Sequence, residues 1–298
     1  MDIIDESKIV IQSLAQKWIG SDSISIDMLR LDLIHPIISG NKWYKLRHNI
    51  EYATQNGFNT LLTFGGPYSN HLSATAGAAK VYGLSSIGIV RGDGQITETL
   101  RQCNDMGMEL YFISREEYKQ KEDPEFLQTL SEQLGHPYII PEGGVNEFGR
   151  LGSEKIEWEI PDGYTHVCVS AGTGTTFIGL RNALSPEIHL LGFAPMKQGT
   201  YLAEEIKPYL KEGQDVNWQL FEQWHFGGFG KSNDELLNFM NDFYRINNIP
   251  LDVVYTAKMM YGVRQMAAAG FFPSGAKVLC VHTGGLQGNV SVRDRLIY

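Results

Sequence analysis

The chain carries one stretch that joins an apolar run to a series of small and hydroxylic residues: His166-Val167-Cys168-Val169-Ser170, then Ala171-Gly172-Thr173-Gly174-Thr175-Thr176. The apolar run predicts a buried strand, and the apolar spacing from Thr175 to Leu184 predicts a helix. Ligands collect at the carboxyl ends of parallel strands, where the first N–H groups of the next helix are free. Two glycines let the backbone curl, and three threonines add hydroxyl donors, which suits a phosphate monoester. A turn without a ligand is the plainer alternative.

The loop does not fit the two best-known phosphate motifs. It lacks the Gly-Lys-Ser/Thr of nucleoside-triphosphate sites. The third glycine and the ribose-binding acid of a dinucleotide fingerprint are also absent.

Short β-rich runs alternate with helical patterns almost to the end of the chain, which predicts an α/β fold with parallel sheets. The expected strands are Thr60–Phe64, Ser86–Val90, Glu109–Ile113, Tyr138–Ile140, His166–Ser170, His189–Phe193, Trp218–Phe221 and Lys277–His282. The expected helices are Ser69–Tyr82, Glu98–Met106, Pro124–Leu134, Ser153–Glu159, Thr175–Leu184, Leu202–Leu210, Asp234–Asn247 and Ala257–Ala269.

Length and charge exclude several classes of protein. The 298 residues suggest two domains or one large α/β unit. The net charge of −9 disfavours nucleic acid and anionic membranes as partners, and no apolar run is long enough to span a bilayer. The N-terminus shows neither a secretory signal nor a transit peptide, so we expect a cytoplasmic protein.

The cysteines and histidines indicate neither disulfides nor a metal site. Cys103, Cys168 and Cys280 are few and far apart, so we expect reduced, buried thiols. The eight histidines show no paired ligand spacing. The glycosylation triplet at Asn289 is incidental without export.

Two further Gly-rich junctions and one lysine complete the set of candidate sites. Phe64-Gly65-Gly66-Pro67-Tyr68-Ser69-Asn70-His71 places a hydroxyl and an amide at a helix start, either as an ordinary N-cap or as an anion site. His282-Thr283-Gly284-Gly285 is weak by itself. Lys42 follows a turn-forming Gly-Asn pair and precedes a helical pattern, so it could be held rigidly. A lysine that forms a Schiff base needs such a partly desolvated position.

Five motifs in this order resemble one family: Ser39-Gly40-Asn41-Lys42-Trp43, Thr63–His71, the loop Gly172–Thr176, Val254-Tyr255-Thr256-Ala257-Lys258, and His282-Thr283-Gly284-Gly285. Together they resemble the 1-aminocyclopropane-1-carboxylate deaminase/D-cysteine desulfhydrase family, over most of the chain. This family belongs to the tryptophan synthase β-subunit-like, fold type II enzymes that use pyridoxal phosphate.

The resemblance implies a role for each matching residue. Lys42 would form the Schiff base with the cofactor, and Asn41 would contact its phenolic oxygen. Lys45 and Asn70 would assist the phosphate, which Gly172, Thr173, Gly174, Thr175 and Thr176 would chiefly hold. Ser69 and His71 would face the substrate carboxylate, with Ser69 and Asn70 near the substrate and Ser69 able to transfer a proton. Tyr255 would lie near the cofactor ring, Thr256 would face the pyridine nitrogen, and Thr283 and Gly284 would complete the cofactor site.

Two positions depart from the family pattern. Thr256 replaces the glutamate of deaminases, so the ring nitrogen would stay neutral and prompt expulsion of a β-leaving group is favoured. Phe229 replaces a substrate-contacting tyrosine and lacks its phenolic proton donor. The working hypothesis is therefore β-elimination of D-cysteine, or a related β-substituted D-amino acid, to pyruvate, ammonia and the leaving group.

Several other functions stay open. A cyclopropane-carboxylate deaminase would form 2-oxobutyrate, and a β-replacement enzyme or racemase would share the cofactor. A non-catalytic pyridoxal-phosphate-binding protein belongs to a different class. A serine hydrolase built on Ser69 and His71 is disfavoured because the Gly-x-Ser-x-Gly elbow is missing.

The resemblance also predicts the organisation of the chain. Residues 1–44 and 149–298 would form a large cofactor-binding domain and residues 45–148 a small α/β domain, with the cofactor between them. Pro141-Glu142-Gly143-Gly144 is the best candidate for a boundary. The expected partners are a small amino-acid substrate and a second copy of the chain in a homodimer.

Overall fold

The computed structural model describes residues 4–197 and 199–298, and these fall into two compact units. The described part of unit 1 comprises Ile4, His35–Ile38 and Lys42–Gly152. Unit 2 comprises Asp5–Ile34, Ser39–Asn41 and Ser153–Tyr298. The chain therefore passes from unit 2 to unit 1 at the peptide bond between Asn41 and Lys42. Among the described residues, no helix has the length and apolar character that crossing a membrane requires.

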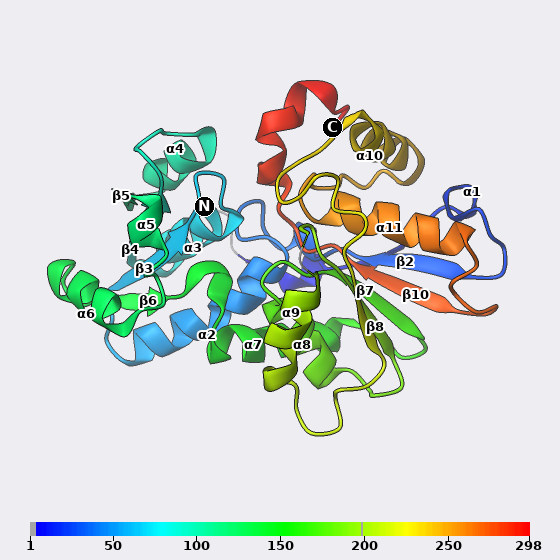
Figure 1. The fold of residues 1–298 in the computed structure, drawn as a ribbon, viewed down its shortest axis with the longest axis horizontal. Coiled ribbons are helices and arrows are strands. Elements are labelled where there is room, and N and C mark those ends of the chain that lie inside the picture. The colour runs from blue at the N-terminus through cyan, green and yellow to red at the C-terminus, as the bar shows by residue number, and fades with distance from the viewer. Residues whose placement is uncertain (1–3, 198) are drawn as a thin grey trace. The chain divides into compact units, whose positions relative to one another are not determined.

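Unit 1 is built on a four-stranded, all-parallel sheet in the order β5-β4-β3-β6 (Figure 1, cyan to green). Its strands are β3 (Thr60–Gly65), β4 (Ser85–Arg91), β5 (Met108–Ile113) and β6 (Tyr138–Ile140). Its helices are α2 (Asn41–Gln55), α3 (Asn70–Tyr82), α4 (Glu98–Asp105), α5 (Arg115–Tyr118), α6 (Pro124–Gln133) and α7 (Glu147–Glu154), of which α2 begins and α7 ends just inside unit 2.

Alternate residues of these strands face two separate apolar cores, as strand geometry requires. On one face, Val90 and Met108 pack with Leu72 of α3 and Leu100 of α4. On the other face, strand residues pack with Tyr118 of α5 and with the apolar side of α6. Unit 1 thus buries both faces of its sheet with its own helices.

Unit 2 is built on a six-stranded sheet in the order β1-β2-β10-β7-β8-β9. The strands are β1 (Ile11–Ser13), β2 (Ser25–Leu29), β7 (His166–Ser170), β8 (His189–Phe193), β9 (Trp218–Phe221) and β10 (Lys277–Val281), and all pair in parallel except β1 with β2. The helices are α1 (Gln16–Ile19), α8 (Thr175–Ala183), α9 (Gly199–Ile206), α10 (Asp234–Asn247) and α11 (Thr256–Ala268).

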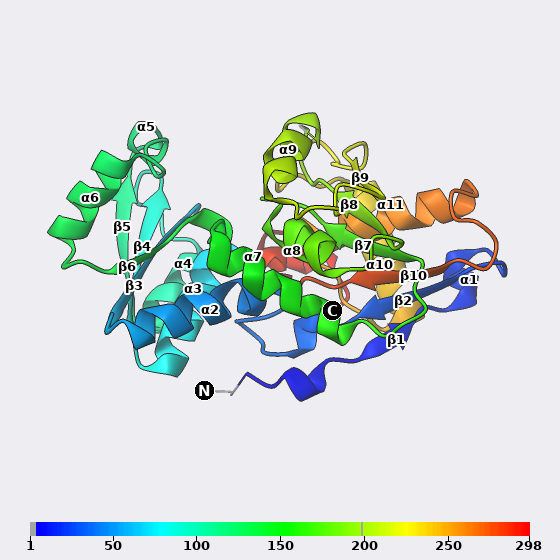
Figure 2. The ribbon, with the colours of Figure 1, turned by 90° about the horizontal axis from the view of Figure 1, so that it is seen from below.

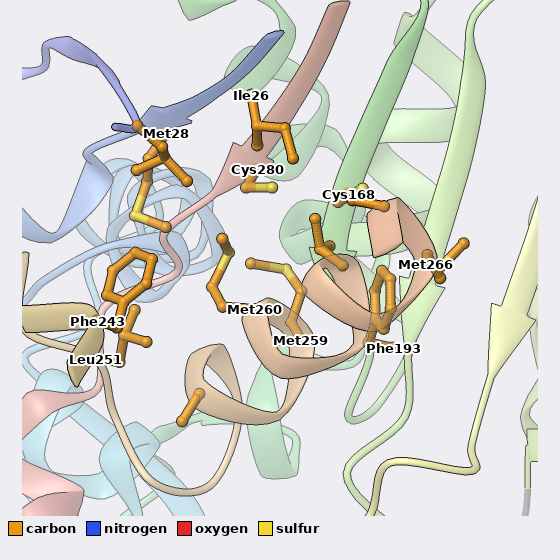
Figure 3. Packing of buried hydrophobic residues seen from close by; sticks show 14 of the residues in the cluster. Ile26, Met28, Cys168, Phe193, Phe243, Leu251, Met259, Met260, Met266 and Cys280 are labelled. Atoms are coloured by element: carbon orange, nitrogen blue, oxygen red, sulfur yellow. The ribbon is translucent and has the colours of Figure 1, made fainter. Parts of the chain in front are cut away.

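Two helix layers cover the sheet of unit 2 (Figure 2). Strand side chains such as Cys168, Phe193 and Cys280 pack against Met259 and Met260 of α11, in the core that Figure 3 shows. The opposite face packs against α8, whose Phe177 ring comes within 2.8 Å of the point where a Cβ on Gly192 of β8 would lie. The carboxyl end of β7 leads into the N-terminus of α8, and the segment after β10 lies beside the start of α2.

The structure confirms the predicted fold class and every predicted strand, to within a residue at the ends. It adds β1 and β2, which were not predicted because they are short and weakly patterned. We expected Lys42 to precede its helix. In the structure it is instead the second residue of α2. Leu202–Leu210 is the end of α9 followed by a 3₁₀ turn at Lys207–Tyr209.

The largest correction concerns the expected helix Ser153–Glu159. The helix in this part of the chain is α7 (Glu147–Glu154), which begins earlier, and Lys155–Glu159 forms only a 3₁₀ helix. The helix was not predicted because it contains Gly149 and Gly152, and glycine has a low helix propensity. A Cβ on Gly149 would lie 2.0 Å from the Gly144 carbonyl oxygen, and one on Gly152 would lie 1.8 Å from that of Tyr44. Close backbone packing, and not a flexible loop, explains these glycines.

Candidate active site

The Gly-rich loop of unit 2 leaves the N-terminus of α8 without a side-chain cap. Gly174 occupies the N-cap position with a left-handed φ of 76°, and no side chain of a described residue accepts a hydrogen bond there. Thr175 and Thr176 are buried, whereas Thr173 is exposed and its Oγ1 lies 3.1 Å from that of Thr175. The uncapped N–H groups and the helix dipole make Gly172–Thr176 a candidate anion-binding loop.

Ser170 adds a polar atom that the sequence analysis quoted but did not select. It is the last residue of β7, and its buried Oγ has no hydrogen-bond partner among the described residues. A buried hydroxyl without a partner costs free energy, which a bound polar ligand would recover. The signal in the sequence was a hydroxyl at the end of an otherwise apolar strand.

Asn41 ties the start of α2 to this loop within unit 2. Its amide Nδ2 donates to Thr176 Oγ1 at 2.9 Å, and its backbone N–H donates to the Thr283 carbonyl at 3.3 Å. Gly40 has a φ of 61°, and a Cβ added to it would lie 2.0 Å from that same carbonyl oxygen. Ser39–Asn41 therefore packs backbone to backbone against Thr283 and Gly284. Lys42, which is half-buried, follows Asn41 by one peptide bond.

The start of α11 brings Tyr255 to the Gly-rich loop. A Cβ on Gly172 would lie 3.0 Å from Tyr255 Cε1, so the phenol ring packs on the backbone there. Phe229 meets Tyr255 edge to face, with ring centroids 5.9 Å apart. Tyr255 and Phe229 thus border the anion-binding loop on one side.

Thr256 is fully buried, and its hydroxyl is bonded to Asp252. Thr256 Oγ1 donates to Asp252 Oδ1 at 2.8 Å and accepts from the Asp252 N–H at 2.8 Å. The Asp252 carboxylate also accepts the N–H groups of Val254, Tyr255 and Thr256. Asp252, which the sequence analysis missed, therefore caps α11 with both of its oxygens.

In unit 1, the N-terminus of α3 holds Ser69, Asn70 and His71. Ser69 is the N-cap, and its Oγ accepts from the Leu72 N–H at 3.2 Å, so its own proton can be donated. Asn70 is buried, and its Oδ1 has no partner among the described residues. Both expected roles of Ser69, as N-cap and as donor, are compatible in this geometry.

Lys45 and His71 form a buried basic group in unit 1. Lys45 Nζ donates to the Gly143 carbonyl at 3.2 Å, and no acidic side chain in the described part of unit 1 pairs with it. Burial, and then the charge of Lys42, hold the pKa of Lys45 well below its usual range. Burial and the same two lysines lower the pKa of His71 to about 3. An anion would compensate this uncancelled positive potential.

The hydrogen bonds of His71 fix which nitrogen carries its proton. Thr63 Oγ1 donates to the Ile140 carbonyl at 2.7 Å and therefore accepts from His71 Nε2 at 3.0 Å. His71 Nδ1 is left as a buried acceptor without a partner in the described residues. A neutral imidazole in this tautomer accepts a hydrogen bond and does not donate one to a carboxylate. It also makes no pair with Ser69, as the serine hydrolase would need.

These features fit pyridoxal phosphate. In unit 2, the uncapped α8 N-terminus suits a phosphate, and Ser170 Oγ is an unsatisfied polar atom. In unit 1, the buried Lys45 suits an anion, and Asn70 Oδ1 is an unsatisfied polar atom. Among residues 4–197 and 199–298, no three His, Cys, Asp or Glu side chains gather as metal ligands would.

Comparison with known proteins decides the family. The model of the pyridoxal-phosphate dependent enzymes matches residues 28–284. The chain belongs to this family. It is therefore an enzyme of fold type II that uses pyridoxal phosphate.

Two relatives and one solved structure narrow the resemblance. A Pyrococcus horikoshii protein, provisionally named 1-aminocyclopropane-1-carboxylate deaminase, is 30% identical over 94% of this chain and 89% of its own. A Thermotoga maritima protein of the same provisional name is 29% identical over 96% of each chain. The crystal structure of an ACC deaminase homologue matches with a TM-score of 0.85 and 29% identity, over 100% of this chain and 95% of that one.

Proposed function

We propose that this enzyme is a lyase that catalyses β-elimination of D-cysteine, or a related β-substituted D-amino acid, to pyruvate, ammonia and the leaving group. When bound, pyridoxal phosphate supplies an electron sink for negative charge at the substrate Cα. Lys42 anchors the cofactor and then removes the Cα proton with its Nζ. The Ser69 hydroxyl, whose proton is available, binds the substrate carboxylate or transfers a proton.

The cofactor's phosphate is assigned to the Gly172–Thr176 loop, with Lys45 and Asn70 assisting. Support comes from the uncapped α8 N-terminus and from the absence of an acidic partner for Lys45 among the described residues of unit 1. Asn41 is held next to that loop by its bond to Thr176 and is assigned to the phenolic oxygen. Thr283 and Gly284 complete the site beside Gly40.

His71 takes a different role from the one the resemblance implied. Its Nδ1 has no hydrogen-bond partner among the described residues and would accept a hydrogen bond, so we assign it to a donor group of the substrate and not to the carboxylate.

The observation that favours elimination over cyclopropane opening concerns Thr256, the first residue of α11. Thr256 offers no carboxylate for the ring nitrogen, and its hydroxyl proton is donated to Asp252. The Asp252 oxygens are in turn occupied by three backbone N–H groups. Without a carboxylate partner the ring nitrogen stays neutral, the electron sink is shallower, and early loss of a leaving group is favoured.

A test combines cofactor absorbance and pyruvate formation from D-cysteine. We expect wild-type enzyme to form pyruvate, and Lys42→Ala to lower the rate by roughly 10²–10⁴-fold, because a general base is lost. Lys80→Ala removes an exposed lysine of α3 and is the matched control. A Lys42→Ala enzyme with wild-type pyruvate formation would contradict the proposal.

A second candidate is supported by the names of the relatives. Both provisionally named deaminases cover most of this chain. If 1-aminocyclopropane-1-carboxylate is the substrate, the product is 2-oxobutyrate, which a coupled keto-acid assay followed by mass spectrometry separates from pyruvate.

The proposal extends to the organisation of the enzyme. We assign the large cofactor-binding domain to unit 2 and the small α/β domain to unit 1, and we propose a homodimer. Light scattering on the eluting holoenzyme would show about twice the chain mass of 33.4 kDa.

A further inference from the structure

Lys258 of α11 is buried, and among the described residues only backbone carbonyls accept hydrogen bonds from its ammonium group. It is 2% exposed, and its Nζ donates to the carbonyls of His225 at 2.9 Å, Gly228 at 2.8 Å and Pro195 at 3.3 Å. Burial lowers the pKa of Lys258 to about 8, against an opposing effect of Asp252. Burying a charged lysine costs free energy, and hydrogen bonds from its three N–H donors offset that cost. These bonds also fix the backbone that carries the three carbonyls.

The segment that it holds is the loop His225–Gly230, whose backbone is strained. Phe226 has a left-handed φ of 51°, which side-chain-bearing residues rarely adopt. Gly227 and Gly228 follow with φ of 95° and 121°. Such a conformation persists only when its surroundings fix it. Two of the three carbonyls that Lys258 binds, those of His225 and Gly228, lie on either side of Phe226 and Gly227.

The same loop carries Phe229 to the border of the anion-binding site. Phe229 is 57% exposed, and its edge-to-face contact with Tyr255 places it next to the phenol that packs on Gly172. Lys258 lies three residues after Tyr255, within the first turn of α11. The N-terminal end of α11 therefore fixes the position of Tyr255 directly. It fixes the position of Phe229 indirectly, through the hydrogen bonds of Lys258 to the loop.

We propose that Lys258 is a positioning residue that fixes the His225–Gly230 loop and thereby makes Phe229 the determinant of substrate size. This inference rests on the proposed function. A fixed phenyl ring beside Tyr255 limits the space for the β-substituent and offers it no polar group. The enzyme therefore prefers small, uncharged β-substituents such as a thiol, and a loosened loop admits bulkier ones.

The test compares holoenzymes of wild type, Lys258→Met, Phe229→Ala and the control Lys231→Met. Lys231 is an exposed lysine directly after the loop. We expect Lys258→Met to accelerate hydrogen exchange at the N–H groups of Gly227, Gly228 and Lys231, which close the loop's internal hydrogen bonds. Lys231→Met should leave this exchange unchanged. If Lys258→Met is not recovered folded, Lys258→Gln replaces it.

Kinetics then separate positioning from mere stability. We expect the ratio of kcat/KM for S-benzyl-D-cysteine to that for D-cysteine to rise roughly tenfold in Lys258→Met and in Phe229→Ala. The double variant should show no further rise, because both changes act on one ring. Lys258→Arg, which keeps the charge and the donors, should restore part of the wild-type ratio.

The outcomes are distinguishable. Unchanged exchange in a folded Lys258 variant would overturn the positioning role, and faster exchange with an unchanged substrate ratio would overturn the role of Phe229 in size selection. A wild-type enzyme that makes no pyruvate from D-cysteine would refute the proposed elimination instead. In that case the exchange data still decide whether Lys258 fixes the loop.

Discussion

Single side chains in unit 1 carry positive charge into the protein interior. Lys45 is buried and donates to the Gly143 carbonyl, and burial together with the charges of Lys42 and Lys45 depresses the pKa of His71. A buried Lys45 ammonium is unfavourable in the protein alone and is compensated when an anion binds. The buried basic side chains therefore destabilise the cofactor-free protein, and binding of the anionic pyridoxal phosphate would offset that cost.

Lys45→Met should therefore have opposite effects on stability and on cofactor binding. We expect the cofactor-free protein to gain about 1–3 kcal/mol of unfolding free energy, because a buried charge is removed. Its affinity for pyridoxal phosphate should fall about tenfold or more, because a charge-assisted bond is lost. Urea unfolding and a cofactor titration measure the two effects, with the exposed Lys80→Met as control. Lower stability combined with unchanged cofactor affinity would contradict this view.

His71 should not titrate in the physiological range. Its folded pKa of about 3 lies below the ordinary value of 6.5, so the imidazole of the cofactor-free protein stays neutral between pH 5 and 8. The unfolded chain binds this proton as pH falls below 6.5 and the folded protein does not, so stability is lost from 6.5 downward. The NMR shift of its Cε1 proton should be flat over pH 5–8, and a shift that moves within this range would contradict the lowered pKa.

At the scale of elements, glycines allow backbones to approach where a strand, a loop and a helix meet. Gly40 lies against Thr283, and Gly284 would place a Cβ 2.5 Å from Ser39 Oγ. The start of α2 is thereby fixed to the end of β10. Lys42 is held by this packing and not by a turn of its own.

Gly40→Ala should displace the start of α2. The new Cβ would lie 2.0 Å from the Thr283 oxygen, and the φ of 61° is unfavourable for alanine. We expect a stability loss of about 2–4 kcal/mol and a loss of cofactor absorbance. Gly213→Ala, with a φ of 79° and nothing within 4 Å, isolates the cost of φ alone. Equal effects of the two substitutions would show that the close approach does not matter.

At the scale of the whole molecule, the two units differ in how the chain builds them. Unit 1 is nearly continuous in sequence and has its own cores on both faces of its sheet. In unit 2, β2 from the N-terminal part of the sequence pairs with β10 from its C-terminal part, and β1 pairs with β2. Unit 2 therefore depends on pairing between strands that are far apart in the sequence.

A fragment spanning residues 35–152 should fold without unit 2. It retains Ile37 and Ile38, which pack near Gly77 of α3, together with the complete parallel sheet. We expect α/β circular dichroism and a cooperative urea transition with a lower midpoint than the full chain. A fragment without a cooperative transition would show that unit 1 depends on the rest of the chain.

Local patterns in the sequence determined the alternation of strands and helices, the Gly-rich junctions and the family, because each of these is written in neighbouring residues. The tertiary structure decided what depends on residues far apart in sequence. The glycines of α7 serve a close approach to Tyr44 and Gly144, and the lowered pKa of His71 depends on its burial and on two lysines. In the sequence, Lys258 looks like an ordinary charged residue of a helix. Its proposed role in fixing the loop follows only from its hydrogen bonds to the carbonyls of Pro195, His225 and Gly228. Burial and hydrogen bonding are properties of the packed chain, and residue spacing alone does not encode them.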